Sequence, residues 1–489
     1  MASIKKNLLF NFILSASQLL LPLISIPYIS HILDPDGIGK VSFVDSLTYY
    51  FISIAEFGIV VYGMREVARV RSNKAALSTL VSELITLHII SSLITICLYV
   101  ITILILWPKV HDVRLILFSF AFLLVNSFAC EWYYYGTEQF RYITSRSVLT
   151  RLCGLVMIFI LVKQPDHYYI YYATIAGSAI LNILFNIGGV VKNLSIRLPQ
   201  QGWKRHIRKT WVTYGISILY SISLMLDNVL LGLVSAAAFV AYYSFAVKLA
   251  RLSALALTDT LLVYFPHIVA LLHQNEKEKF QQAILRNAQL LNLFSLPIGA
   301  GLFLLSTEIA AVVFGPSFMP VALDLRILSV VPFLRCYNLF LSKQVLIAYD
   351  QERLYLKSLL ITAIVFVPAT LLLSYYFQDV GASVSMVVYE GTLLLLNYFY
   401  ARKVDSSLKI FEWKSIIHGI AGAALFVPII LLARQWREPD WLWLTVVILT
   451  ATIVYLLFQL FVLRNELMLS LRAWSIQYLN NQLLRQPKK

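Results

Sequence analysis

Charged residues are scarce in this chain of 489 residues, and long polar loops are missing. Only 13% of the residues are Asp, Glu, Lys or Arg, whereas 59% are hydrophobic and the mean hydropathy is +0.76. Soluble domains normally contain about 25% charged residues, so this composition excludes a soluble protein. We expect a polytopic membrane protein of the all-α class, because helices satisfy every backbone hydrogen bond inside a bilayer.

Motifs for catalysis and metal binding are also missing. The sequence contains no G-x-x-x-x-G-K-[ST] phosphate loop, no H-E-x-x-H and no G-x-S-x-G. Its four cysteines lie in apolar segments without metal-ligand or disulfide spacing. We therefore expect no enzyme, no cofactor and no bound metal. Any transport must draw on a substrate gradient, an ion gradient or the membrane potential.

Apolar stretches of about 18–26 residues, long enough to cross a bilayer as helices, recur along the chain. The first follows Lys5 and Lys6 and lacks a small-residue cleavage site, which indicates an uncleaved span. Counting the stretches predicts about fourteen transmembrane helices. Their expected limits are 8–33, 41–64, 81–106, 115–136, 147–163, 169–191, 211–234, 239–266, 284–306, 322–347, 358–377, 384–401, 416–433 and 441–463.

Lys and Arg residues are distributed unevenly between alternate loops. About 29 of the 40 lie in one set of loops and about seven in the other. The positive-inside rule makes the basic set cytoplasmic, and an even number of spans places both termini on that side. This topology, together with attraction to anionic lipids, explains the net charge of +15 without a nucleic-acid partner.

The longest cytoplasmic loop, 192–210, divides the first twelve spans into six and six. Because six is even, any structural repeat would be parallel, about an axis along the membrane normal. The tail has Leu467, Leu471, Trp474 and Tyr478 at helical spacing, which is typical of an amphipathic interfacial helix, although a loosely ordered basic tail is the alternative. The predicted parts are an N-lobe (1–191), a basic linker (192–210), a C-lobe (211–401), two further spans (402–463) and a cytoplasmic tail (464–489).

Two cations lie where a spanning helix should be most apolar. Counted from Phe239, Lys248 is about 14 Å and Arg251 about 18 Å along the helix, near the middle of a ~30 Å hydrocarbon core. Three residues apart, they share one helix face. One cation at this depth costs about 2.5–3.5 kcal/mol, so the pair requires a water-filled cavity, a counter-charge or an anionic ligand. A structural ion pair with an acid on a neighbouring helix is the alternative.

Other ionisable residues can be sorted by depth. Arg335 lies about 20 Å from the outer start of its span, near mid-depth. Glu83 and Glu131 lie close to the inner interface, where we expect them to be solvated. A net cationic centre favours an anionic substrate. An exporter of cationic drugs would be expected to have acids there, and Asp227 and Glu390 keep that alternative open.

A family resemblance is visible in several strings. Residues 132–143 (WYYYGTEQFRYI), followed by Arg146, resemble the W-x-x-x-G-x-E-x-F-x-Y-I-x-x-R signature of bacterial lipid-linked oligosaccharide flippases. These are the O-antigen and capsule repeat-unit exporters of the multidrug/oligosaccharidyl-lipid/polysaccharide superfamily. Asn228 departs from the family pattern, which has a basic residue there. Further similar strings are Phe57-Gly58 with Arg65-Glu66, Leu226-Asp227-Asn228, residues 242–248 (YYSFAVK), Phe314-Gly315 with Phe318, and residues 344–348 (QVLIA).

The resemblance implies two six-helix lobes around a central cavity, with two additional C-terminal helices. The implied activity moves undecaprenyl-diphosphate-linked oligosaccharide repeat units from the cytoplasmic to the periplasmic leaflet of the bacterial inner membrane by alternating access. This step would serve O-antigen or related polysaccharide biosynthesis. The implied partners are the lipid-linked oligosaccharide, membrane lipids and the polysaccharide polymerase and chain-length machinery.

The mid-depth cations suit a diphosphate, because Arg binds phosphate oxygens bidentately and Lys acts as a point charge. We expect Lys248, Arg251 and Arg335 to hold the diphosphate or acidic sugars. Arg65 and Arg146 would form an initial binding site near the cytoplasmic face. The acids Asp227 and Glu390 are candidates for ion coupling or charge compensation.

Two other functions compete with this interpretation. An ion-coupled antiporter of drugs or small molecules, with the same fold, would need an essential acid in the membrane such as Asp227. A membrane-embedded glycan polymerase or ligase would be an enzyme and would normally require a large outer loop, and the sequence contains none.

Overall fold

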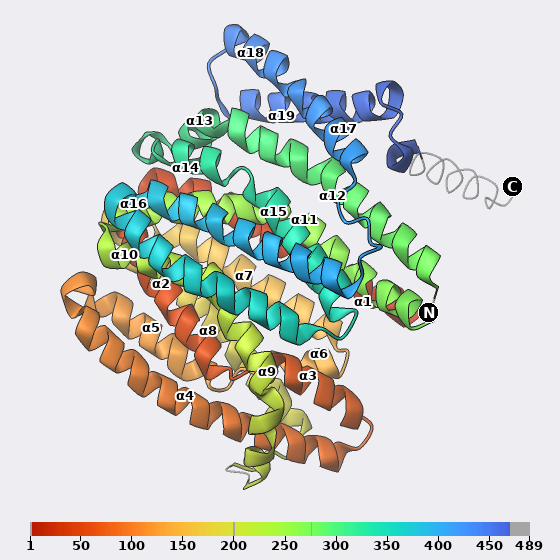
Figure 1. Cartoon of the computed structure of the whole chain (residues 1–489). Helices are drawn as coiled ribbons and strands as arrows, with labels where there is room; N and C mark the ends of the chain where they lie inside the picture. The colour runs from red at the N-terminus through yellow and green to blue at the C-terminus, as the bar shows by residue number, and fades with distance from the viewer. Residues whose placement is uncertain (1, 199–200, 275, 470–489) are drawn as a thin grey trace, which may run out of the picture. The chain divides into compact units, whose positions relative to one another are not determined.

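The computed structural model describes residues 2–198, 201–274 and 276–469. Across these residues the secondary structure is helical, with no strand (Figure 1). The chain forms two compact units. Unit 1 comprises Met1–Phe245 and Leu359–Met386, and unit 2 comprises Ala246–Ser358 and Val387–Lys489.

Unit 1 contains the first ten α-helices. A sharp bend of 43° separates α2 from α3, where Phe57 and Gly58 adopt positive φ angles of 48° and 70°. A side chain at Gly58 would also meet the backbone nitrogen of Tyr214 at 2.8 Å, so glycine is required on both counts. The helices are α1 (Ala2–Ile32), α2 (Pro35–Ala55), α3 (Ile59–Val70), α4 (Lys74–Val110), α5 (Val113–Asn126), α6 (Glu131–Gly136), α7 (Phe140–Leu161), α8 (Tyr168–Asn193), α9 (Lys204–Ser221) and α10 (Asp227–Val234).

Two long helices, α11 (Ala237–His273) and α16 (Glu352–Val404), contribute residues to both units. The 53 residues of α16 would extend about 80 Å as one helix, far more than a bilayer core of about 30 Å. Gln378 has non-helical dihedral angles and divides α16 into two arms. Each arm has the length of one membrane span.

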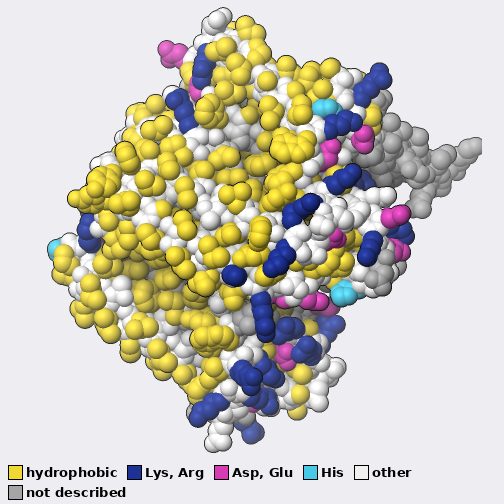
Figure 2. All heavy atoms as spheres, viewed as in Figure 1, with side chains coloured by type: hydrophobic (Ala, Val, Ile, Leu, Met, Phe, Trp, Pro, Cys, Tyr) yellow, Lys and Arg dark blue, Asp and Glu magenta, His cyan; other side chains and the backbone are white. Residues whose placement is uncertain are grey.

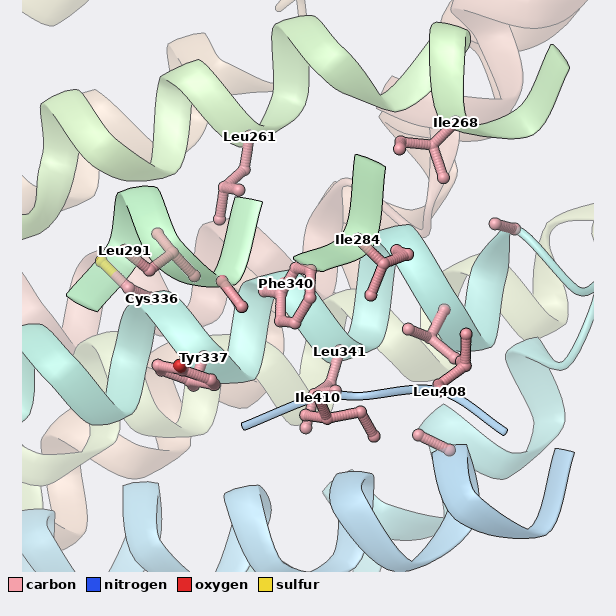
Figure 3. Packing of buried hydrophobic residues seen from close by; sticks show 14 of the residues in the cluster. Leu261, Ile268, Ile284, Leu291, Cys336, Tyr337, Phe340, Leu341, Leu408 and Ile410 are labelled. Atoms are coloured by element: carbon pink, nitrogen blue, oxygen red, sulfur yellow. The ribbon is translucent and has the colours of Figure 1, made fainter. Parts of the chain in front are cut away.

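Unit 2 is built around helices that follow α11. Its core packs side chains of α11, α12 and α15 together with Leu408 and Ile410 (Figure 3). A bend of 42° separates α14 from α15. The helices are α12 (Lys277–Leu304), α13 (Ser306–Ile309), α14 (Val321–Leu328), α15 (Val331–Leu339) with the π-helix η6 (Phe340–Ile347), α17 (Trp413–Ala424), α18 (Phe426–Trp436) and α19 (Trp441–Leu457).

The described residues contain eleven helices that are long and apolar enough to cross a membrane, or thirteen if each bent pair is one span. If each arm of α16 is also counted as a separate span, the number is consistent with the fourteen spans expected from the sequence. The predicted all-α, multi-pass membrane fold is confirmed. The bends were not predicted: the expected continuous spans 41–64 and 322–347 are both broken. The lobes expected at 1–191 and 211–401 stay a prediction, and residues 470–489 of the expected amphipathic tail lie outside the described part.

The surface in Figure 2 is mainly apolar, as a lipid-facing surface should be. Lys and Arg side chains gather on it where Figure 1 shows α3 and α9 of unit 1. Their exposed cations include Arg65, Arg69, Arg208 and Lys209. This end of unit 1 corresponds to loops that the positive-inside rule places in the cytoplasm.

Candidate functional site

Arg335 and Glu390, predicted separately from the sequence, form an ion pair inside unit 2. Arg335 Nη1 lies 3.0 Å from Glu390 Oε1, and the two side chains are 16% and 3% exposed. Asn338, about one turn along α15 from Arg335, donates from Nδ2 to the Glu390 Oε2 at 2.7 Å and to its backbone carbonyl at 2.9 Å. The carboxylate therefore has one charged and one neutral donor.

Lys248 and Arg251 both lie on α11, about one turn apart. Lys248 is exposed and Arg251 is half-buried. Further along the same helix, Ala254 and Leu257 pack into the core of unit 2 together with residues of α15. The structure thus places the three predicted deep cations in one unit, on α11 and α15.

In unit 1, Arg146 is almost completely buried, at 5% exposure. Its Nη2 donates to Glu131 Oε1 at 2.9 Å, and its guanidinium lies 5.8 Å and 5.5 Å from the ring centroids of Tyr134 and Tyr142. The two rings stack on each other at 4.8 Å. The Nε and Nη1 atoms of Arg146 are buried without a hydrogen-bond partner among the described residues. Such an arginine is fixed by packing and retains unused donors.

Arg65 is exposed on α3, where its Nε lies 3.8 Å from Glu66. Arg69 forms a closer pair with the same carboxylate, at 2.8 Å. Arg65 and Arg146 therefore have different surroundings: Arg65 is exposed, and Arg146 is buried beside two stacked tyrosine rings. That the two form a single initial binding site stays a prediction.

Asp227 is fully buried at the start of α10. Its Oδ2 accepts a hydrogen bond from the Tyr243 hydroxyl at 2.8 Å, and its Oδ1 accepts one from the Asn228 backbone at 2.9 Å. The Asn228 side chain donates to Ser46 Oγ of α2 at 3.0 Å. The departure from the family pattern at Asn228 thus has a structural role, because the amide joins α10 to α2.

Sequence analysis did not single out Arg151 as a candidate, and it misjudged the burial of Glu83. Arg151 is half-buried on α7 and donates to Ser17 Oγ of α1 at 3.2 Å. Glu83, expected to be solvated, is instead only 3% exposed and contacts Arg205 and His206. Glu131 is partly exposed, at 45% of its side chain. Only the cluster of arginines at the start of the predicted fifth span pointed toward Arg151.

Within the described residues, no group of three or more His, Cys, Asp or Glu residues has an arrangement that could hold a metal ion. Unit 2 presents ammonium and guanidinium groups on α11 and α15, and unit 1 presents the guanidinium of Arg146 beside two tyrosine rings. Groups of these kinds can bind anions.

Comparison with known proteins identifies the family of the chain. Residues 4–272, more than half of it, match the sequence profile of a family described as polysaccharide biosynthesis protein. The chain belongs to this family. The resemblance that the sequence motifs indicated is thereby confirmed at the level of the family.

This family member is similar to curated proteins named "Putative O-antigen transporter" in two bacteria. The protein of Escherichia coli (strain K12) is 22% identical over 408 residues, which span 82% of this chain and 97% of the relative. The protein of Shigella dysenteriae is also 22% identical, over 401 residues spanning 80% and 98%. Both alignments extend over nearly the whole relative.

Solved structures with the same fold include the lipid II flippase MurJ in an inward closed conformation, with a TM-score of 0.72 at 14% identity. That match covers 94% of this chain and 99% of the solved chain. An inward-facing multidrug resistance MATE family transporter of the MOP superfamily gives a TM-score of 0.61 at 16% identity, covering 80% and 95%. At such identities the likeness shows the fold alone.

Proposed function

We propose that this protein is a flippase of undecaprenyl-diphosphate-linked oligosaccharide repeat units. It moves them from the cytoplasmic to the periplasmic leaflet of the bacterial inner membrane for O-antigen or related polysaccharide biosynthesis. The observation that supports this most directly is the set of deep cations on α11 and α15, in a chain whose curated relatives bear the name of O-antigen transporters.

In this proposal, Lys248, Arg251 and Arg335 hold the diphosphate. The guanidinium groups supply planar pairs of N–H donors that match phosphate oxygens, and the ammonium adds a point charge. Arg335 is positioned by Glu390, so a ligand that replaces this carboxylate meets an arginine already in place. Arg65 and Arg146 receive the substrate near the cytoplasmic face.

The flippase works as a transporter and not as an enzyme, with both termini in the cytoplasm and without a cofactor. Its product, a repeat unit on the outer leaflet, is delivered to the polysaccharide polymerase and chain-length machinery. Energy comes from a gradient or from the membrane potential, with Asp227 and Glu390 as the candidates for ion coupling or charge compensation.

The test begins with depletion of the protein in its host. A probe that reaches only the periplasmic face then reports where the lipid-linked repeat unit accumulates. Single repeat units trapped on the cytoplasmic leaflet are the expected result. Units that reach the outer leaflet and stay unpolymerised would point to a polymerase or ligase. The complete absence of a lipid-linked intermediate would direct attention to drug export.

Neutral variants then test the site. Lys248→Gln and Arg251→Gln should each reduce flipping about tenfold or more, since each removes a charge-assisted contact of about 1.5–3 kcal/mol. Arg437→Gln is the control, because Arg437 is 51% exposed and pairs with Asp440 near the end of α18. Unchanged flipping in both site variants would refute the site assignment and leave the family membership intact.

The second candidate function is an antiporter of drugs or other small molecules, as the MATE-like fold allows. It depends on a buried acid, and Asp227 is fully buried on α10. Asp227→Asn should then abolish export while cation variants retain it. For the flippase, the cation variants should lose activity, whether or not Asp227→Asn does so.

A further inference from the structure

Glu390 is held at both carboxylate oxygens by two kinds of donor. On one side Arg335 Nη1 donates to Oε1 at 3.0 Å, and on the other Asn338 Nδ2 donates to Oε2 at 2.7 Å. The Glu390 side chain is 3% exposed, whereas that of Arg335 is 16% exposed. Of the two partners, the arginine is the one that a ligand can reach.

A second layer of buried polar groups fixes Asn338. Asn397 Nδ2 donates to Asn338 Oδ1 at 3.4 Å, and Ser358 Oγ donates to Asn397 Oδ1 at 2.7 Å. Asn338 is 5% exposed, and Asn397 and Ser358 are fully buried. The amide of Asn338 therefore keeps its NH₂ group toward Glu390, whatever Arg335 contacts.

Loss of Arg335 would leave Glu390 as an uncompensated charge in a low-dielectric interior. An uncompensated charge there is costly, because burial disfavours charged groups, so another cation or a proton has to replace Arg335. On α15 the Cys336 thiol also interacts electrostatically with Arg335 and Glu390. A thiol carries no positive charge, so Cys336, which is fully buried, cannot replace the lost guanidinium.

We propose that substrate and proton are coupled at this ion pair, with Glu390 as the proton acceptor. When diphosphate oxygens take the N–H donors of Arg335, Glu390 takes one proton from water on Oε1, the oxygen that Arg335 leaves. Oε2 continues to accept from Asn338. On release of the diphosphate the proton returns to water and the ion pair re-forms. This inference rests on the proposed function of the chain as a flippase.

The test measures protons taken up on ligand binding by the purified full chain in detergent. The probe is undecaprenyl-diphospho-N-acetylglucosamine, a diphosphate diester without a group that titrates near neutral pH. Isothermal titration calorimetry in two buffers of different ionisation enthalpy gives the number of protons bound per probe. The wild type should take up about one proton.

Glu390→Gln keeps the hydrogen bond with Asn338 and removes the titrating group. It should bind the probe at least as tightly as the wild type, with proton uptake near zero. Arg335→Gln leaves Glu390 already neutral, so it should also show no uptake, together with at least about tenfold weaker binding. The matched control is Glu308→Gln, which removes another buried carboxylate of unit 2, 2.6 Å from Arg434, and should leave the proton count unchanged.

Binding of the probe by the wild type without proton uptake would overturn the coupling, as would undiminished uptake by Glu390→Gln. These results would leave the proposed flippase intact. Failure of the wild type to bind the probe would instead count against the proposed function itself. The two proposals therefore fail in different ways.

Discussion

Replacement of Glu83 by leucine should detach the start of α9 from the rest of unit 1. Glu83 lies on α4 and is 3% exposed. Its Oε2 accepts from Arg205 Nη2 at 2.5 Å and from His206 Nε2 at 3.0 Å. The other ring nitrogen of His206 lies 2.8 Å from the Tyr62 hydroxyl of α3. The start of α9 is thus anchored within unit 1 through one buried carboxylate.

The expected loss can be worked out from these contacts. A hydrogen bond with a charged group contributes about 1.5–3 kcal/mol to stability. The Arg205 side chain is 59% exposed, so its pair with Glu83 adds at most about 1 kcal/mol. The buried bond from His206 therefore dominates, and its loss should raise the open fraction of this segment by about tenfold to about 150-fold.

Limited digestion with trypsin measures this opening on the purified protein in detergent. The segment offers cleavage sites after Lys204, Arg205, Arg208 and Lys209. When opening and closing are fast relative to cleavage, the rate follows the population of the open form. The cleavage rate in Glu83→Leu should rise by the same factor as the open fraction.

Glu138→Gln is the matched control, because Glu138 is 56% exposed and pairs with the exposed Arg71. Such surface pairs contribute little, so its cleavage rate should match the wild type. Equal rates for Glu83→Leu and Glu138→Gln would refute the anchoring role of Glu83.

Three further predictions concern unit 1. Gly39→Ala should destabilise the fold by about 1–3 kcal/mol, because its Cβ would lie 1.7 Å from a backbone carbonyl of α11, whereas Gly177→Ala, with open space around it, should leave the apparent melting temperature unchanged. Glu131→Gln should destabilise the protein by about 1–3 kcal/mol and so lower that temperature, since it leaves the buried Arg146 without its counter-charge. An unchanged temperature would show that the contacts with the tyrosine rings suffice. Burial opposes ionisation of Asp112, but bonds from a tyrosine and an arginine outweigh it and hold its pKa below the usual value. Asp112 therefore stabilises the fold above about pH 4, and this stabilisation is lost as the pH falls through its lowered folded-state pKa. In a plot of stability against pH, Asp112→Asn should lose stability less steeply than the wild type on the acid side. Two parallel curves would contradict this prediction.

The sequence by itself determined the class of protein, the approximate spans and the distribution of basic loops. These properties depend on local hydropathy and charge, because the hydropathy and flanking charges of each segment decide whether and in which orientation it crosses the bilayer. The family motif around Trp132 and Arg146 is likewise local. Lys248, Arg251 and Arg335 could be singled out because a cation at mid-depth is costly wherever the helix packs.

The tertiary structure decided which charges meet. Arg335 and Glu390 are 55 residues apart in the chain, and Glu83 and His206 are 123 residues apart, so no periodicity links them. Such pairing depends on which helix faces pack together, and this is set by side-chain shape across the whole unit. The bend at Gly58 also depends on a distant contact, the backbone of Tyr214, which hydropathy does not register.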